Sequence, residues 1–157
     1  MFEDLKRIAN NASTLQPFEI YALSIDNKAK ELIIQLNTEG KPTSQLFTKH
    51  IDSLDQPLYS QLHESGVYSI TTELLSQGRK KAGTPYTLKD TGDFYKSWKV
   101  KVVSDGIEID ADPVKETTNL FEEYGIDILG LTEGNIGILN ESIIDDFRSN
   151  TINEILE

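Results

Sequence analysis

Two short runs of alternating residues constrain the fold of this chain more than any other feature. Valines alternate with lysines over residues 99–102, and apolar residues alternate with acidic ones over residues 107–111. Ser104-Asp105-Gly106 lies between the two runs. Alternate side chains of a strand point to opposite faces, and an Asp-Gly pair between two such runs is a strong hairpin signal. The pattern predicts an antiparallel hairpin whose Val and Ile side chains are buried and whose charged side chains face water.

The residues after the hairpin predict a helix, a strand and a long final helix. Pro113 ends the second strand, residues 114–124 are typical of a short helix that ends at Gly125, and residues 126–131 are apolar enough for a short strand. Thr132 can cap the last helix, with Glu133 in its first turn. We expect the apolar stripe of this helix to be mainly core, and also partner surface at its free end; it consists of Ile136, Leu139, Ile143, Phe147, Ile152 and Ile155.

The first 87 residues are predicted to be mainly helical. Apolar residues from Phe2 to Ala12 recur at helical spacing, and Pro17 suits the first turn of a second helix that breaks near residues 24–27 and resumes to Leu36. Residues 37–42 contain the breakers of this helix. The apolar residues after them, Leu46, Phe47, Ile51 and Leu54, fit helical or irregular structure; residues 67–75 favour a helix, and residues 77–87 an exposed loop.

These patterns predict one α+β domain over residues 1–157. A small antiparallel sheet centred on the hairpin is packed by helices, including the long C-terminal one. The chain has the length of one ordinary domain. Its hydrophobic content of 38% is low for a globular protein and compatible with some stabilisation by neighbouring subunits.

The charge balance and the absence of cysteine exclude several classes of function. Twenty-six acidic and fifteen basic residues give a net charge of −11, which disfavours sequence-specific binding of nucleic acid. The basic run Arg79-Lys80-Lys81 fits a solvated loop, or a phosphate or partner contact. Without cysteine there are no disulfides and no thiolate sites. No segment has the length of a membrane span and the first residues lack the apolar run of a signal peptide, so we expect a cytoplasm-like compartment.

Residues 88–157 resemble a family of tailed-phage proteins called virion-morphogenesis, tail-completion or head–tail joining proteins. Residues 88–97, LKDTGDFYKS, match its L-x-x-T-G-x-(Leu/Phe)-x-x-S segment, which a hairpin follows. Tyr124-Gly125 matches an aromatic-glycine pair, and residues 128–133, ILGLTE, match the run that opens its C-terminal helix. Ile126-Asp127 stands where the family usually has Pro-Arg, and the first 87 residues match poorly.

The resemblance implies a structural virion protein that forms a homo-oligomeric ring at the head–tail junction, as a neck, connector or tail-completion subunit. Its partners would be the portal or connector and tail proteins, and DNA would pass through the ring without specific binding. We expect part of the −11 charge to line that channel, because carboxylates repel phosphate.

Two groups of residues are candidates for structural or interface roles. The first is expected to form the turn and helix cap before the hairpin: Leu88, Asp90, Thr91, Gly92 and Ser97. The second is expected to contact a neighbouring subunit: Trp98, Glu123, Tyr124, Gly125, Leu129, Gly130 and Leu131. For Trp98 a core position is favoured over the interface role, because large aromatic residues dominate core packing.

Other functions are weighed against this one. Asp90-Thr91-Gly92 is also the active-site triplet of aspartic proteases, but charged Lys89 and Asp93 flank it and are typical of a solvated turn. An acidic adaptor or regulatory binding protein is the main alternative. His50 and His63 lack further convergent ligands, and Pro113 interrupts the calcium-loop spacing of Asp110 and Asp112. We therefore expect no catalytic residue, no metal and no cofactor.

Overall fold

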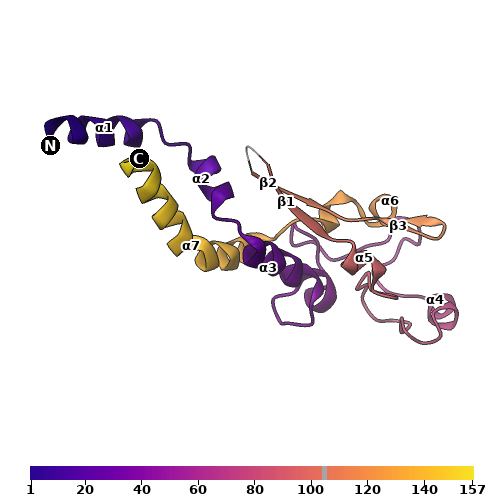
Figure 1. The fold of residues 1–157 in the computed structure, drawn as a ribbon. Coiled ribbons are helices and arrows are strands. Elements are labelled where there is room, and N and C mark those ends of the chain that lie inside the picture. Colours follow the sequence, from indigo (N-terminus) through magenta and orange to yellow (C-terminus); the bar gives the residue numbers. More distant parts are fainter. Residues whose placement is uncertain (104–105) are drawn as a thin grey trace.

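The computed structural model describes residues 1–103 and 106–157, which form an α+β fold with a long C-terminal helix, as the sequence predicts (Figure 1). The helices are α1 (Phe2–Ser13), α2 (Pro17–Leu23), α3 (Asn27–Thr38), α4 (Ile70–Leu75), α5 (Asp93–Lys96), α6 (Leu120–Tyr124) and α7 (Glu133–Leu156). A π-helical turn, η1 (Gln45–Lys49), and a 3-10 turn, η2 (Ile126–Ile128), accompany them. The strands are β1 (Lys99–Val103), β2 (Gly106–Asp110), β3 (Val114–Lys115) and β4 (Thr118–Asn119).

The predicted hairpin is the larger of two antiparallel ribbons. In it β1 pairs with β2, with Val100 opposite Ile109 and Val102 opposite Ile107. Val100, Ile107 and Ile109 pack against the helices, whereas the lysines and acidic residues between them are exposed. Of the predicted Ser104-Asp105-Gly106 turn, only Gly106 belongs to the described residues, as the first residue of β2. The alternation therefore predicted the strands and their pairing correctly, but Val100, Ile107 and Ile109 are only half-buried and Val102 is 38% exposed, so the prediction of a buried apolar face is only partly confirmed.

The N-terminal helices begin and end near the predicted positions. Pro17 occupies the first position of α2, where its missing N–H has no partner to lose. The Asp26 side chain accepts a hydrogen bond from the Ala29 backbone and caps α3 after the predicted break. Residues 45–49 form the π turn, and only residues 70–75 of the helix expected over 67–75 are helical, because Val67 pairs with Pro85 in a β-bridge.

Two predictions for the C-terminal half are wrong. Residues 114–119 form the β3–β4 ribbon, and only residues 120–124 of the expected helix are helical. Glu116 has a positive φ of 52° at the tight turn of the ribbon, which helical continuation does not allow. Residues 126–131 contain the 3-10 turn η2 and no strand of the named sheets. The predicted stop of α6 at Gly125 and the Thr132 cap of α7 are confirmed.

Two clusters of buried side chains form the core. The larger contains residues from the middle of the chain and the α5–α6 region, among them Leu46, Tyr86, Trp98 and Ile128. The smaller lies where α3 and α7 meet the hairpin, and its buried members are Ile25, Ala29, Ile33, Leu139 and Ile143. Leu139 and Ile143 confirm the core part of the α7 stripe, whereas Ile152, near its free end, is exposed.

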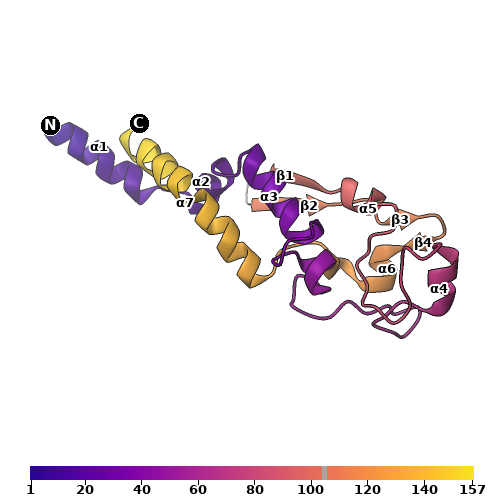
Figure 2. The same cartoon turned by 90° about the horizontal axis from the view of Figure 1, so that it is seen from below.

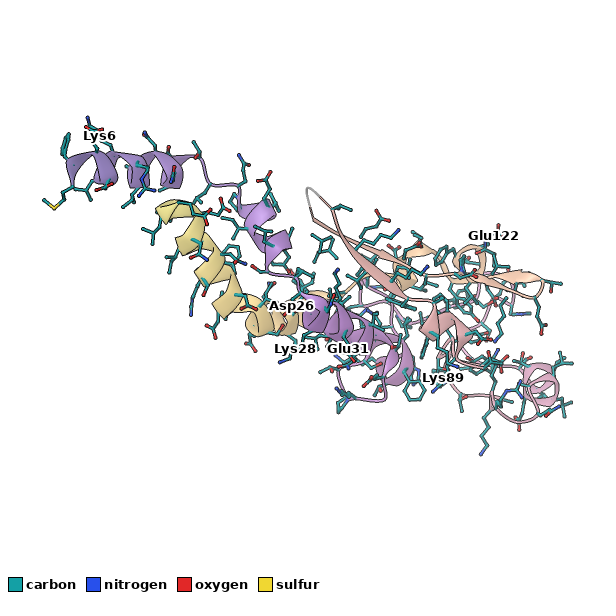
Figure 3. The ribbon with its side chains drawn as sticks, in the orientation of Figure 1. Lys6, Asp26, Lys28, Glu31, Lys89 and Glu122 are labelled. Atoms are coloured by element: carbon teal, nitrogen blue, oxygen red, sulfur yellow. The ribbon has the colours of Figure 1, made fainter. Side chains whose placement is uncertain are left out.

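The molecule is elongated, with helices at one end and loops at the other (Figures 1 and 2). Both views place α1 and the last turns of α7 together at one end, so the two termini are neighbours, and α4 lies at the opposite end. Figure 3 shows side chains of α1 that project freely from this helical end. In the described part of the chain, no helix combines the length and the apolar character that crossing a membrane requires.

Candidate functional site

Four charged side chains join three segments that are far apart in the sequence. The Asp90 carboxylate, in the turn before α5, accepts hydrogen bonds from Arg79 Nε at 2.9 Å and from Lys115 Nζ at 2.7 Å. Lys80 Nζ lies 3.6 Å from the same carboxylate. Arg79 and Lys80 come from the loop after α4, and Lys115 comes from β3. These four residues are called the Asp90 clamp below.

The clamp keeps Asp90 charged, although its side chain is only 14% exposed. Burial on its own would raise the pKa of this carboxyl, but the hydrogen bonds from Lys115 and Arg79 and the charge of Lys80 outweigh it and hold the pKa well below its ordinary value. The pKa of Lys80 is lowered by burial and by the nearby charge of Lys115, which the Asp90 carboxylate opposes. The cluster is therefore a charged network and not a proton-sharing one.

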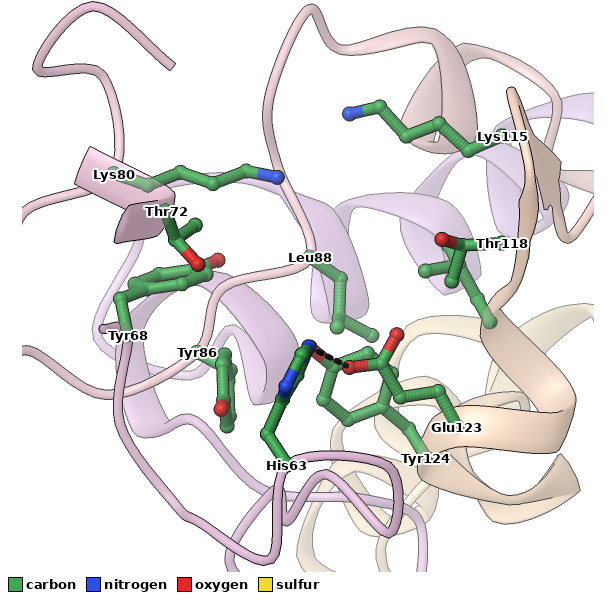
Figure 4. A pocket seen from close by; sticks show the side chains of 11 residues that line it. His63, Tyr68, Thr72, Lys80, Tyr86, Leu88, Lys115, Thr118, Glu123 and Tyr124 are labelled. Atoms are coloured by element: carbon green, nitrogen blue, oxygen red, sulfur yellow. Dashed lines mark ion pairs between the residues drawn. The ribbon is translucent and has the colours of Figure 1, made fainter. Parts of the chain in front are cut away.

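A polar cavity of about 160 Å³ lies beside the clamp (Figure 4). Lys80 and Lys115 point into it from one side, and Glu123 and His63 face each other on the other side. The buried Glu123 carboxylate accepts a hydrogen bond from Ser60 Oγ at 2.6 Å and lies 3.8 Å from His63 Nε2. A buried carboxylate loses its hydration, and hydrogen-bonding or charged partners such as these usually compensate for that loss.

Three tyrosines in edge-to-face contact line part of this cavity. The ring of Tyr86 makes edge-to-face contacts with Tyr68, at 4.7 Å between centroids, and with Tyr124, at 5.1 Å. Burial, followed by the charge of Glu123, raises the pKa of the Tyr124 hydroxyl far above its ordinary value. Burial also raises the pKa of the Tyr86 hydroxyl, so Tyr86 and Tyr124 stay protonated and contribute packing and hydrogen-bonding capacity.

What this arrangement does most directly is to hold three segments together. Each cation of the clamp faces the Asp90 carboxylate, and the loop after α4 is also tied down by its backbone. Ala82 N donates to Glu73 Oε2 at 2.7 Å, and Lys80 N donates to Ser76 Oγ at 3.0 Å. Among the described residues, no three His, Cys, Asp or Glu side chains converge as metal ligands would.

The predicted turn residues lie together, but the capping role of Asp90 is wrong. The N-cap of α5 is Gly92, in the left-handed region at a φ of 90°, and the Thr91 hydroxyl accepts a long hydrogen bond of 3.4 Å from Asp93 N, the first residue of the helix. Lys89, Thr91 and Asp93 are exposed, as a solvated turn requires, whereas the Asp90 carboxylate turns away to the three cations and is mostly shielded from water. The Thr91 hydroxyl donates to the Asp93 carboxylate at 2.6 Å. Ser97 ends α5, and its Oγ accepts a hydrogen bond from Asp112 N at 2.9 Å.

Leu88 and the predicted interface residues are distributed mainly over the interior. Leu88 is buried in the larger core cluster, despite a positive φ of 57°. Trp98 is buried in the same cluster, as the core alternative for it expected, and Glu123 is buried at the cavity. Neither side chain offers a surface to a neighbour, and this corrects the interface expectation for these two residues. The remaining members are half-buried, and their contact with a neighbouring subunit stays a prediction: Tyr124, Gly125, Leu129, Gly130 and Leu131.

Sequence reasoning missed the partners that make this site. Lys115 carries no local signal, because it lies in a segment expected to be helical. Ser60 and His63 come from the stretch that was hardest to interpret, and their link to Glu123 spans about 60 residues. The basic run at residues 79–81 is visible in the sequence. Its pairing with Asp90, through Arg79 and Lys80, is not.

Comparison of the chain with models of protein families, with curated proteins and with solved structures gave no match.

Proposed function

We propose that this chain is a structural subunit of a tailed-phage particle, which assembles with copies of itself into a ring at the head–tail junction or the tail end. The resemblance of residues 88–157 motivates the particle and the position. The self-assembly is supported by an independent feature of the structure, the helical end of the molecule.

The observation that carries the proposal is that α1 is a strongly amphipathic helix without a single buried residue. Phe2 and Leu5 on its apolar side are exposed. Among the described residues, the side-chain hydrogen bonds from α1 to the rest of the protein come from Arg7 and Asn11, which donate to carbonyls in the last turn of α7. A helix of 12 residues is marginal in water unless its apolar face is packed. A neighbouring copy that covers this face would supply the missing packing.

The Asp90 clamp supports a structural role for the Asp-Thr-Gly triplet. Aspartic proteases need two adjacent carboxyls that share a proton, which requires a raised pKa on one of them. Asp90 has the opposite environment, with three cations and a lowered pKa. Its position between three segments favours a role in holding the fold.

The acidic composition fits passage of DNA through the proposed ring. A channel that carries carboxylates repels the phosphate backbone and prevents adhesion. The sequence supplies an excess of eleven acidic residues for such a surface. An assembled ring with a strongly positive channel would contradict this part of the proposal.

Sedimentation velocity on the purified chain, alone and mixed with a candidate portal protein, tests the proposal. We expect a discrete oligomer, formed either by the chain alone or on the portal. Electron microscopy of native particles would then place the ring at the head–tail junction or the tail end. A chain that stays monomeric at high concentration and with the portal would instead favour the adaptor function.

A further inference from the structure

Two exposed apolar surfaces lie at opposite ends of the elongated molecule. One is the tip of α4, formed by Ile70, Leu74 and Leu75. The other is a groove at the helical end, between α1, α2 and the last turns of α7. Figures 1 and 2 both show α4 and this helical end far apart along the long axis. Neither surface can therefore cover the other within one copy.

The α4 tip exposes three large aliphatic side chains within six residues. Leu74 is 74% exposed and Leu75 is 80% exposed, and Ile70 lies one turn before Leu74 on the same face of the helix. None of the six residues of α4 is buried. Single exposed leucines are common on protein surfaces, but a contiguous group of them is typical of an interaction site.

Hydrogen bonds and ion pairs hold the α4 tip in place. Ser69 caps α4 through a hydrogen bond from Thr72 N at 3.1 Å. The Asp90 clamp then fixes the loop that follows the helix, through Arg79 and Lys80. A surface that is rigid before binding loses less conformational entropy on association. The clamp thus presents the tip ready for docking.

The groove at the helical end is lined mainly by polar atoms, with a smaller apolar part and an acidic rim. Its volume is about 320 Å³, and its apolar lining comes from Leu15, Ile20 and Leu23. Leu23 is 65% exposed. The carboxylates at the rim belong to Glu19, Glu154 and Glu157.

The charges around the two surfaces are complementary. The helical end, residues 1–23 and 133–157, contains nine acidic and three basic residues. Residues 70–83, around the α4 tip, contain three basic residues and one acidic residue. Asp90 offsets part of that positive charge, whereas Lys81 is exposed and makes no ion pair with any described residue. Opposite charges favour the encounter of these two ends over that of two like ends.

We propose that the α4 tip of one copy docks into the groove of the next copy, so that Leu74 and Leu75 pack on Leu15 and Leu23 while Lys81 faces the acidic rim. This inference rests on the proposed self-assembly and specifies one contact in it, which is separate from the apolar face of α1. Contact between two different patches is heterologous, and it closes into a ring when the rotation between copies allows it.

Cross-linking tests the contact directly, because the chain has no native cysteine. Leu75→Cys and Leu23→Cys are prepared as separate single variants, mixed and oxidised. We expect a disulfide-linked dimer that contains one copy of each variant. The control pairs Leu75→Cys with Leu54→Cys, since Leu54 is 61% exposed and belongs to neither surface. Equal linkage in the control pair, or none between positions 75 and 23, overturns the inference.

Charge placed on the tip gives a second test that does not depend on a disulfide. Leu75→Asp is expected to weaken self-association about thirtyfold, the loss typical of a central interface residue. Leu54→Asp is expected to assemble like the unchanged chain, and far-ultraviolet circular dichroism checks that both variants are folded. Full assembly by Leu75→Asp overturns the docking mode and leaves the proposed function standing. An unchanged chain that stays monomeric both alone and with the portal overturns both.

Discussion

Asp90 shows how a single carboxylate can join segments that the chain keeps apart. It is largely removed from water, which would cost several kilocalories per mole for an isolated charge. Three cations from the loop after α4 and from β3 offset that cost. Removal of the negative charge would leave Arg79, Lys80 and Lys115 close together without their counter-ion.

We expect Asp90→Asn to lower the free energy of unfolding by about 2 kcal/mol at pH 7, since charged hydrogen bonds are lost. The effect depends on pH. The pKa of Asp90 is lower in the folded chain than its ordinary value of 3.8, so the stabilisation is fully present above about pH 5 and is lost as the pH falls further. Urea unfolding of the unchanged chain and of Asp90→Asn at pH 7 and pH 3 checks this. The difference between their free energies of unfolding should be smaller at pH 3.

The control for this prediction is Asp127→Asn. Asp127 is exposed, and within the described residues its side chain makes no hydrogen bond or ion pair. It should change stability by less than about 0.5 kcal/mol at either pH. A loss as large as that of Asp90→Asn would mean that net charge, and not the clamp, is responsible.

Two glycines near α7 should respond in opposite directions to the same substitution. Gly130 has a φ of 117°, and an added Cβ would lie 3.1 Å from Ser53 Cβ. Gly137 lies within α7, and an added Cβ there would meet nothing within 4 Å. We expect Gly130→Ala to destabilise the chain by about 2 kcal/mol through strain, and Gly137→Ala to stabilise it by roughly 0.5–1 kcal/mol. Thermal unfolding of the two variants measures both signs.

At the scale of residues, the sequence predicted local roles at helix ends better than it predicted contacts between distant residues. Gly125 at the end of α6 and Thr132 at the start of α7 follow from local backbone chemistry, which a sequence displays directly. The partners of Asp90 and Glu123 depend on how distant segments pack. No spacing rule relates position 90 to position 115 before the fold is known.

Among the elements, the helices and the hairpin were predicted, whereas the two-residue strands β3 and β4 were not. The hairpin, α1, α3 and α7 have enough residues for the pattern to appear. The β3–β4 ribbon has only two residues in each strand, and residues 114–124 contain charged residues that fit a helix equally well. Two features favour the ribbon over a helix: the positive φ of Glu116 at its tight turn, and the hydrogen bond from Lys115 to Asp90. The second of these is a tertiary contact.

A buried polar cluster fastens α7 to the N-terminal half. Asn135 Nδ2 donates to the Thr43 carbonyl at 2.9 Å and to Gln45 Oε1 at 3.0 Å, and it also reaches the Leu36 carbonyl. Gln45 Nε2 in turn donates to Asn37 Oδ1 at 3.0 Å. Each of these hydrogen bonds stabilises the fold, because a buried polar group that loses its partner is not compensated for its desolvation.

Asn135→Ala should therefore lower the free energy of unfolding by about 3 kcal/mol, since it leaves the carbonyls of residues 36 and 43 with fewer donors. Asn153→Ala, an exposed position on the same helix, should change it by less than about 0.5 kcal/mol. Guanidinium unfolding followed by circular dichroism compares the two. A loss as large in Asn153→Ala would show that the buried hydrogen bonds of Asn135 do not account for the effect, since alanine favours the helix more than asparagine does.

At the scale of the whole molecule, the two core clusters are neighbours that share side chains. Ile109 of β2 packs against both clusters. Helix α3 contributes Ile33 to the smaller cluster, while the next residue, Ile34, packs against the larger one. A disturbance in one cluster thus reaches the other through the hairpin and α3. This connection agrees with the expectation of one domain, which unfolding cooperativity can test.

Ile143→Ala removes a buried side chain from the smaller cluster only, and we expect it to cost about 3 kcal/mol. Trp98, the single tryptophan, reports on the larger cluster by fluorescence. If the chain is one cooperative unit, the fluorescence midpoint must fall as far as the circular dichroism midpoint, because coincident probes indicate two-state unfolding. Ile144→Ala, which alters the exposed neighbour, should leave both midpoints nearly unchanged. A Trp98 transition that stays in place while the helices melt earlier would divide the chain into two independently folding parts.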